Sequence, residues 1–102
     1  MAWHKATTTT QLTDRQVVGV EVNGVEVAVY RLDDGYYATN NICTHQRAFM
    51  SDGYIENDCI ECPLHQAIFD IKTGAALEGP AKGPLASYPT RVDGDDILVE
   101  LP

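Results

Sequence analysis

The chain has 102 residues, of which 44% are hydrophobic and 22% charged, and its formal net charge at pH 7 is −8. This length predicts a single domain, and the composition is that of a folded globular protein. No apolar run reaches the roughly 18 residues that cross a bilayer, and the acidic excess disfavours a nucleic-acid surface. The start, MAWHKATTTT, lacks the apolar stretch of a signal peptide, which predicts a cytoplasmic protein.

From the N-terminus onward the pattern predicts β-strands. Two valine-rich segments, QVVGVEV (16–22) and VEVAVYRL (25–32), are separated by Asn23-Gly24, a strong hairpin signal. A DDG turn then leads into a third short strand, YYAT (36–39). No segment keeps the 3.6-residue apolar period of a helix. The first 40 residues therefore predict an antiparallel framework.

The middle of the chain carries the residues with metal chemistry. All three cysteines and two of the three histidines lie between Ile42 and Gly74. Within this segment Tyr54–Ile60 is predicted to be one strand that runs into a loop. A Gly/Pro-rich stretch, EGPAKGPL (78–85), follows and predicts a stiff loop.

The end of the chain returns to the β pattern, with ASYPTRV (86–92) and DILVEL (96–101) on either side of a turn. The whole chain is therefore predicted to be one domain, residues 1–102. Its framework comprises residues 1–40 and 79–102, and residues 41–78 form an inserted subdomain that carries the site.

The cysteines and histidines fall into two mixed pairs. Cys43 and His45 form C-x-H, and after sixteen intervening residues Cys62 and His65 form C-x-x-H. Each pair offers one thiolate and one imidazole, both of which bind transition metals. A single pair of this kind arises easily by chance, whereas two at this separation predict a metal site. These four residues are the candidate ligands.

A structural zinc site is the alternative. Cys59 and Cys62 form a C-x-x-C, so Cys43, His45, Cys59 and Cys62 could make a tetrahedral Cys₃His set. Against it, the predicted strand around Cys59 has no glycine to turn the C-x-x-C, and the set leaves His65 without a role. We expect Cys59 to be a small buried hydrophobe.

The segments YATNNICTH, SDGYIE and ECPLHQ resemble the Rieske [2Fe–2S] ferredoxins of bacterial aromatic-ring-hydroxylating dioxygenase systems. The resemblance covers nearly the whole chain and implies an all-β Rieske fold, with antiparallel sheets and a small cluster-binding subdomain inserted in a β framework. It also implies one [2Fe–2S] cluster, with Cys43 and Cys62 on one iron and His45 and His65 on the other. Two neutral imidazoles in place of two thiolates remove negative charge, so such a cluster accepts an electron more readily.

Four positions separate this chain from the high-potential members of that family. Those members join the two loops by a disulfide, where this chain has Ala48 and Leu64. They also direct a serine and a tyrosine hydroxyl at the cluster sulfurs, where this chain has Ala67 and Phe69. The resemblance therefore implies a low reduction potential.

The resemblance implies an electron carrier and not an enzyme. With His45 and His65 assigned, His4 alone remains, and the 2-His-1-carboxylate iron site of an oxygenase cannot be built. We expect His4 at the surface of the framework. The implied partners are a flavin-containing NAD(P)H reductase, which supplies single electrons, and a terminal ring-hydroxylating oxygenase, which receives them.

The expected protein is a monomer without nucleic-acid or membrane partners. Two alternatives stay open from the sequence: a Rieske electron-transfer subunit of another redox complex, such as one acting on nitrite or arsenite, and a zinc-stabilised structural module.

Overall fold

The computed structural model describes residues 2–12, 16–43, 48–63, 67–79 and 83–102. Across these residues the structure is all-β, as predicted, and none of them lies in an α-helix or in a helix able to span a membrane. The elements are β1 (Ala2–Thr8), η1 (Thr9–Gln11), β2 (Val17–Val22), β3 (Val25–Leu32), β4 (Gly35–Asn40), η2 (Met50–Asp52), β5 (Tyr54–Glu56), β6 (Cys59–Glu61), β7 (Ile68–Asp70), β8 (Ala76–Glu78), β9 (Ser87–Tyr88), β10 (Thr90–Asp93) and β11 (Asp96–Leu101).

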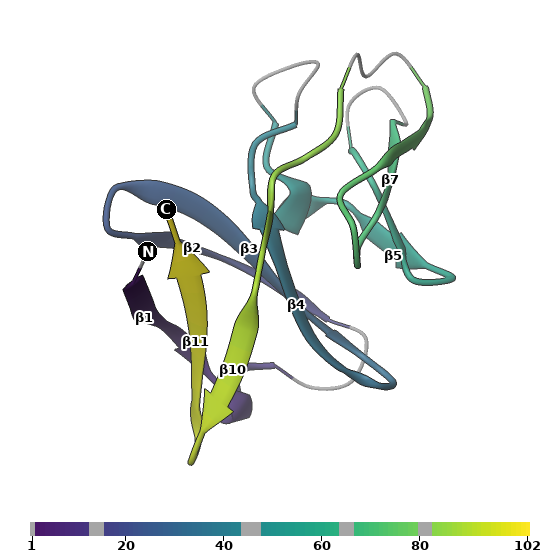
Figure 1. Cartoon of the computed structure of the whole chain (residues 1–102). Coiled ribbons are helices and arrows are strands. Elements are labelled where there is room, and N and C mark those ends of the chain that lie inside the picture. The colour runs from purple at the N-terminus through teal and green to yellow at the C-terminus, as the bar shows by residue number, and fades with distance from the viewer. Residues whose placement is uncertain (1, 13–15, 44–47, 64–66, 80–82) are drawn as a thin grey trace.

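The strands form three antiparallel sheets. Their strand orders are β1-β11-β10, β2-β3-β4-β9 and β5-β6-β7-β8. The β5–β8 sheet lies at the opposite end of the molecule from the turn of the β10–β11 hairpin (Figure 1). It is inserted between β4 and β9, and the backbone N–H of Asn40 donates to the carbonyl of Ala86 (2.8 Å) where the chain leaves and returns.

Strand β3 is the centre of the fold because both of its faces are buried. Val27 and Val29 pack into one core with β11, and Ala28, Tyr30 and Leu32 pack into a second core with the β5–β8 sheet. This double burial explains why β3 reads as a nearly continuous apolar run. In the second core the Tyr30 hydroxyl shares a 2.8 Å hydrogen bond with the hydroxyl of Thr39, and burial raises the pKa of Tyr30.

The hairpin predicted at Asn23-Gly24 is confirmed, since β2 and β3 pair on either side of this turn. Asn23 and Gly24 adopt φ of 51° and 82°, the left-handed pair that joins twisted strands tightly. The predicted strand 86–92 divides at Pro89 into β9 and β10, because proline lacks the N–H that a continuous ladder needs. Strands β1, β7 and β8 were not predicted.

The prediction of one strand over Tyr54–Ile60 is wrong. The segment is a hairpin of β5 and β6, in which Glu56 pairs with Cys59. Asn57 and Asp58 make its turn with φ of 52° and 62°. Asparagine and aspartate tolerate this left-handed conformation, so no glycine is needed.

Replacing Gly74 by alanine is expected to lower the free energy of unfolding by roughly 2–4 kcal/mol, by adding a steric clash to left-handed strain. Gly74 has φ of 81°, and a Cβ there would collide with the carbonyl of Leu85. Gly94→Ala is the matched control, because Gly94 has φ of 63° and open space around the added carbon. Urea unfolding of both variants separates the steric clash from the backbone strain. If both variants lose the same free energy of unfolding, the clash does not occur.

Candidate metal centre

Two candidate ligands occupy the same backbone setting in two different loops. The N–H of Cys43 donates to the carbonyl of Ala48 (2.9 Å), and the N–H of Cys62 donates to the carbonyl of Ala67 (2.7 Å). Each cysteine therefore begins a loop that an alanine closes five residues later. The two cysteines could be picked out from the sequence, but the equivalent backbone hydrogen bonds that close the two loops could not.

The first loop is fixed to η2 by Asn41, which is 2% exposed. The Asn41 side-chain oxygen accepts the N–H of Ser51 (2.8 Å), and its amide nitrogen donates to the Ser51 hydroxyl (3.1 Å). Its backbone carbonyl accepts the N–H of Met50 (2.7 Å). Ile42 and Phe49 form a bridge just outside the loop. A buried amide with these partners holds the entry and the exit of the loop together.

The second loop is the connection of a hairpin. Glu61 of β6 pairs with Ile68 of β7 immediately outside Cys62 and Ala67. Ile60 and Phe69, the next pair along, are fully buried. The cysteine thus continues a strand whose inner face is anchored in the core.

Both cysteines lie in one core, where Cys43 is 4% and Cys62 is 0% exposed. Neither is in a disulfide. Two buried thiols, presented by two loops that enter one core, fit the cysteine half of an iron–sulfur donor set. The predicted ligands His45 and His65, and Leu64, lie outside the described residues. His4 lies partly exposed in β1, in a different sheet from both loops.

The expectation that Cys59 is buried is wrong. It lies partly exposed on the outer face of the β5–β8 sheet, because the neighbouring Ile60 takes the inward position. Partial burial, together with the negative charges of Asp70 and Asp58, raises the pKa of the Cys59 thiol. All three cysteines are described, and they do not meet in a group that could hold a metal ion. This geometry removes the Cys₃His zinc alternative.

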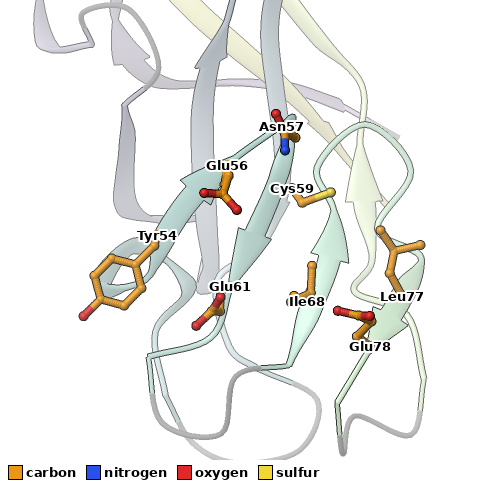
Figure 2. A pocket seen from close by; sticks show the side chains of 8 residues that line it. All are labelled: Tyr54, Glu56, Asn57, Cys59, Glu61, Ile68, Leu77 and Glu78. Carbon is orange, nitrogen blue, oxygen red and sulfur yellow. The ribbon is translucent and has the colours of Figure 1, made fainter.

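The outer face of the β5–β8 sheet contains a shallow cavity of about 460 Å³ (Figure 2). Its lining mixes carboxylates with exposed apolar side chains: Tyr54, Glu56, Asn57, Cys59, Glu61, Ile68, Leu77 and Glu78. This surface was not predicted from the sequence. The alternation of Tyr54, Ile55 and Glu56 could have revealed it, since only the middle residue packs into the core.

Comparisons with known proteins indicate an iron–sulfur domain. Residues 2–89 match the family model of the Rieske [2Fe–2S] domain. The chain is 41% identical over 99 residues to the ferredoxin component of a naphthalene 1,2-dioxygenase system of Pseudomonas aeruginosa, covering 97% of this chain and 95% of the relative.

Solved structures give the same result. The ferredoxin of carbazole 1,9a-dioxygenase from Nocardioides aromaticivorans superposes with a TM-score of 0.90 at 37% identity, covering 97% of both chains. A complex of reduced oxygenase and oxidized ferredoxin in carbazole 1,9a-dioxygenase contains a chain that matches with a TM-score of 0.88 at 33% identity, covering 95% of this chain and 91% of that one.

The relatives named as ferredoxin components are electron carriers, and the described part of this chain holds two buried thiols in one core. The chain belongs to the Rieske [2Fe–2S] domain family, as a ferredoxin that carries one [2Fe–2S] cluster and is not itself an enzyme.

Proposed function

We propose that this ferredoxin passes single electrons from a flavin-containing NAD(P)H reductase to a terminal ring-hydroxylating oxygenase. The observation that carries the proposal is the pair of cysteine loops that enter one core. The similarity to ferredoxin components of dioxygenase systems supports the direction of electron flow, and a related ferredoxin forms a complex with its oxygenase.

The proposed ligands are Cys43, His45, Cys62 and His65, within an inserted subdomain of residues 41–78 on a framework of residues 1–40 and 79–102. When bound, the cluster supplies a one-electron couple. The chain's own contribution is to hold two thiols in a dry core and to fix both loops at their bases.

The proposed setting is the cytoplasm, where the protein acts as a monomer. Its three cysteines, all described, form no disulfide, as is usual in a reducing compartment. A reductase that uses NAD(P)H also works in that compartment.

An anaerobic electron count tests the proposal. Iron and acid-labile sulfide are expected at about two each per chain, and dithionite titration is expected to consume about one electron per chain. The reduced protein, mixed with a purified ring-hydroxylating oxygenase, is then expected to lose its reduced-state EPR signal. Uptake of two electrons per chain would contradict the carrier role. So would a reduced protein that keeps its EPR signal after it is mixed with the oxygenase.

A further inference from the structure

The outer face of the β5–β8 sheet carries the two most exposed of the large apolar side chains among the described residues. Tyr54 is 65% exposed and Leu77 is 51% exposed, and Ile68 lies partly exposed between them. Figure 2 shows Tyr54, Glu61, Ile68 and Glu78 in a row across the four strands. These three apolar side chains line one cavity together with carboxylates, and apolar surface surrounded by polar residues in this way is typical of a protein interaction site.

The same face is strongly negative. Glu56, Glu61 and Glu78 line its cavity. The segment that contains the sheet, residues 52–78, has six acidic residues and one basic residue, Lys72, and so accounts for −5 of the net charge of −8. Lys72 already donates to Asp34 (2.7 Å) and approaches Asp58 (3.8 Å). Among the described residues, none of the ion pairs involves Glu56, Glu61 or Glu78.

This face also adjoins the metal centre along the backbone. Glu61 directly precedes Cys62, and Ile68 directly follows Ala67, whose carbonyl closes the loop. A protein seated on the row from Tyr54 to Glu78 would therefore rest beside the base of a ligand loop. Electron transfer falls steeply with distance, so a partner's position here matters to the rate.

We propose that this acidic sheet face, comprising Tyr54, Glu56, Glu61, Ile68, Leu77 and Glu78, docks an electropositive protein redox partner. The inference rests on the proposed carrier function. Charge complementarity defines the occupant: a surface on which lysine or arginine side chains surround an apolar contact that receives Tyr54 and Leu77. The carboxylates steer the encounter, and the two apolar side chains hold the complex. A second copy of this chain is disfavoured, because two faces of the same negative charge would meet.

Mitochondrial cytochrome c is a suitable probe, since lysine side chains surround its exposed haem edge. The holoprotein, reduced by dithionite, gives up one electron, and the haem iron goes from ferric to ferrous. Glu61→Gln/Glu78→Gln is expected to lower the second-order rate about three- to tenfold at 0.01 M salt, where the Debye length is about 30 Å. The charge-matched control is Asp93→Asn/Asp95→Asn, on the distant β10–β11 hairpin, and it is expected to retain most of the wild-type rate.

A second pair of variants tests the apolar anchors. Tyr54→Ala/Leu77→Ala is expected to weaken the affinity for oxidised cytochrome c by about threefold or more in isothermal titration, without changing its salt dependence. Val92→Ala is the control, because Val92 is 47% exposed on β10, away from the proposed face. Equal effects of face and control variants would overturn the proposal and leave only net-charge attraction.

Analytical ultracentrifugation tests whether a second copy of this chain occupies the face instead. Self-association of the wild-type protein that Tyr54→Ala/Leu77→Ala abolishes would overturn the proposal in favour of a homodimer interface. Failure of docking is distinguishable from failure of the carrier function. In the first case the face variants bind cytochrome c like the wild type while the chain still accepts one electron; in the second, the chain accepts none.

Discussion

Replacing Cys43 or Cys62 by serine is expected to give a nearly colourless protein with little bound iron. A serine hydroxyl is a poor iron ligand compared with a thiolate. The backbone hydrogen bond that closes each loop does not involve the cysteine side chain, so the substitution removes the ligand and leaves this bond in place. Iron analysis and the visible spectrum of the purified variants measure the effect.

The same substitutions are expected to destabilise the fold, because a metal held by both cysteines would cross-link two loops that share one core. A loss of about 3 kcal/mol would lower the Tm by roughly 12–24 °C in a domain of this size. Thermal unfolding followed by circular dichroism gives the shift.

Cys59→Ser is the control for both measurements. Cys59 lies partly exposed on the outer sheet face and keeps a raised pKa, so it remains a thiol at neutral pH. This variant is expected to keep its iron, its colour and its Tm within about 3 °C, because it leaves the core unchanged. Loss of the cluster here, or its retention in Cys43→Ser, would show that the ligand assignment is wrong.

Phe69→Tyr is expected to raise the reduction potential by roughly 40–90 mV. A hydrogen bond to a charged group contributes about 1.5–3 kcal/mol, of which about 1–2 kcal/mol distinguishes the two oxidation states. For a one-electron couple about 59 mV corresponds to about 1.4 kcal/mol. Phe69 is fully buried in the core that contains both cysteines, and we expect a hydroxyl at the end of its ring to reach the cluster.

The wild-type core explains why an added donor should matter. Among the described apolar residues buried there, Tyr30 alone has a hydroxyl, and Thr39 already shares a hydrogen bond with it. Ala67→Ser, combined with Phe69→Tyr, is expected to raise the potential by about 80–180 mV in total if the two effects add. Phe69→Leu is the control for altered packing without a donor.

A redox titration followed by the circular dichroism of the cluster measures these potentials. The Phe69→Tyr protein is also expected to reduce an oxygenase more slowly, because its driving force is smaller. If its midpoint stays within about 10 mV of the wild type, a change too small for a hydrogen bond of this strength, the hydroxyl does not reach the cluster.

The framework could be predicted from the sequence because its signals are local. Strands β2 and β3 are long enough to show their pattern, and Asn23-Gly24 marks the turn between them. The strands of the β5–β8 sheet have three residues each, which is too short for a period to emerge. Their pairing depends on contacts with the rest of the protein, which a single segment does not reveal.

For the candidate site, the sequence indicated which residues matter but not which way every side chain points. The spacing of cysteine and histidine, and the resemblance it supports, made Cys43 and Cys62 candidate ligands, and the structure brings both into one core. The side on which Cys59 points depended on the turn at Asn57 and Asp58, which was not recognised. Missing that turn also hid the acidic outer face, because the direction of every side chain in β5 and β6 follows from it.

The hydrogen bond between Asn40 and Ala86 has a consequence for engineering. The chain enters and leaves the β5–β8 region at adjacent points, so residues 41–86 have the geometry of a cassette that can be exchanged without moving either end. The cassette is not self-sufficient, because Ala28, Tyr30 and Leu32 of β3 form one wall of its core. A successful graft therefore requires a recipient whose central strand offers the same three apolar side chains.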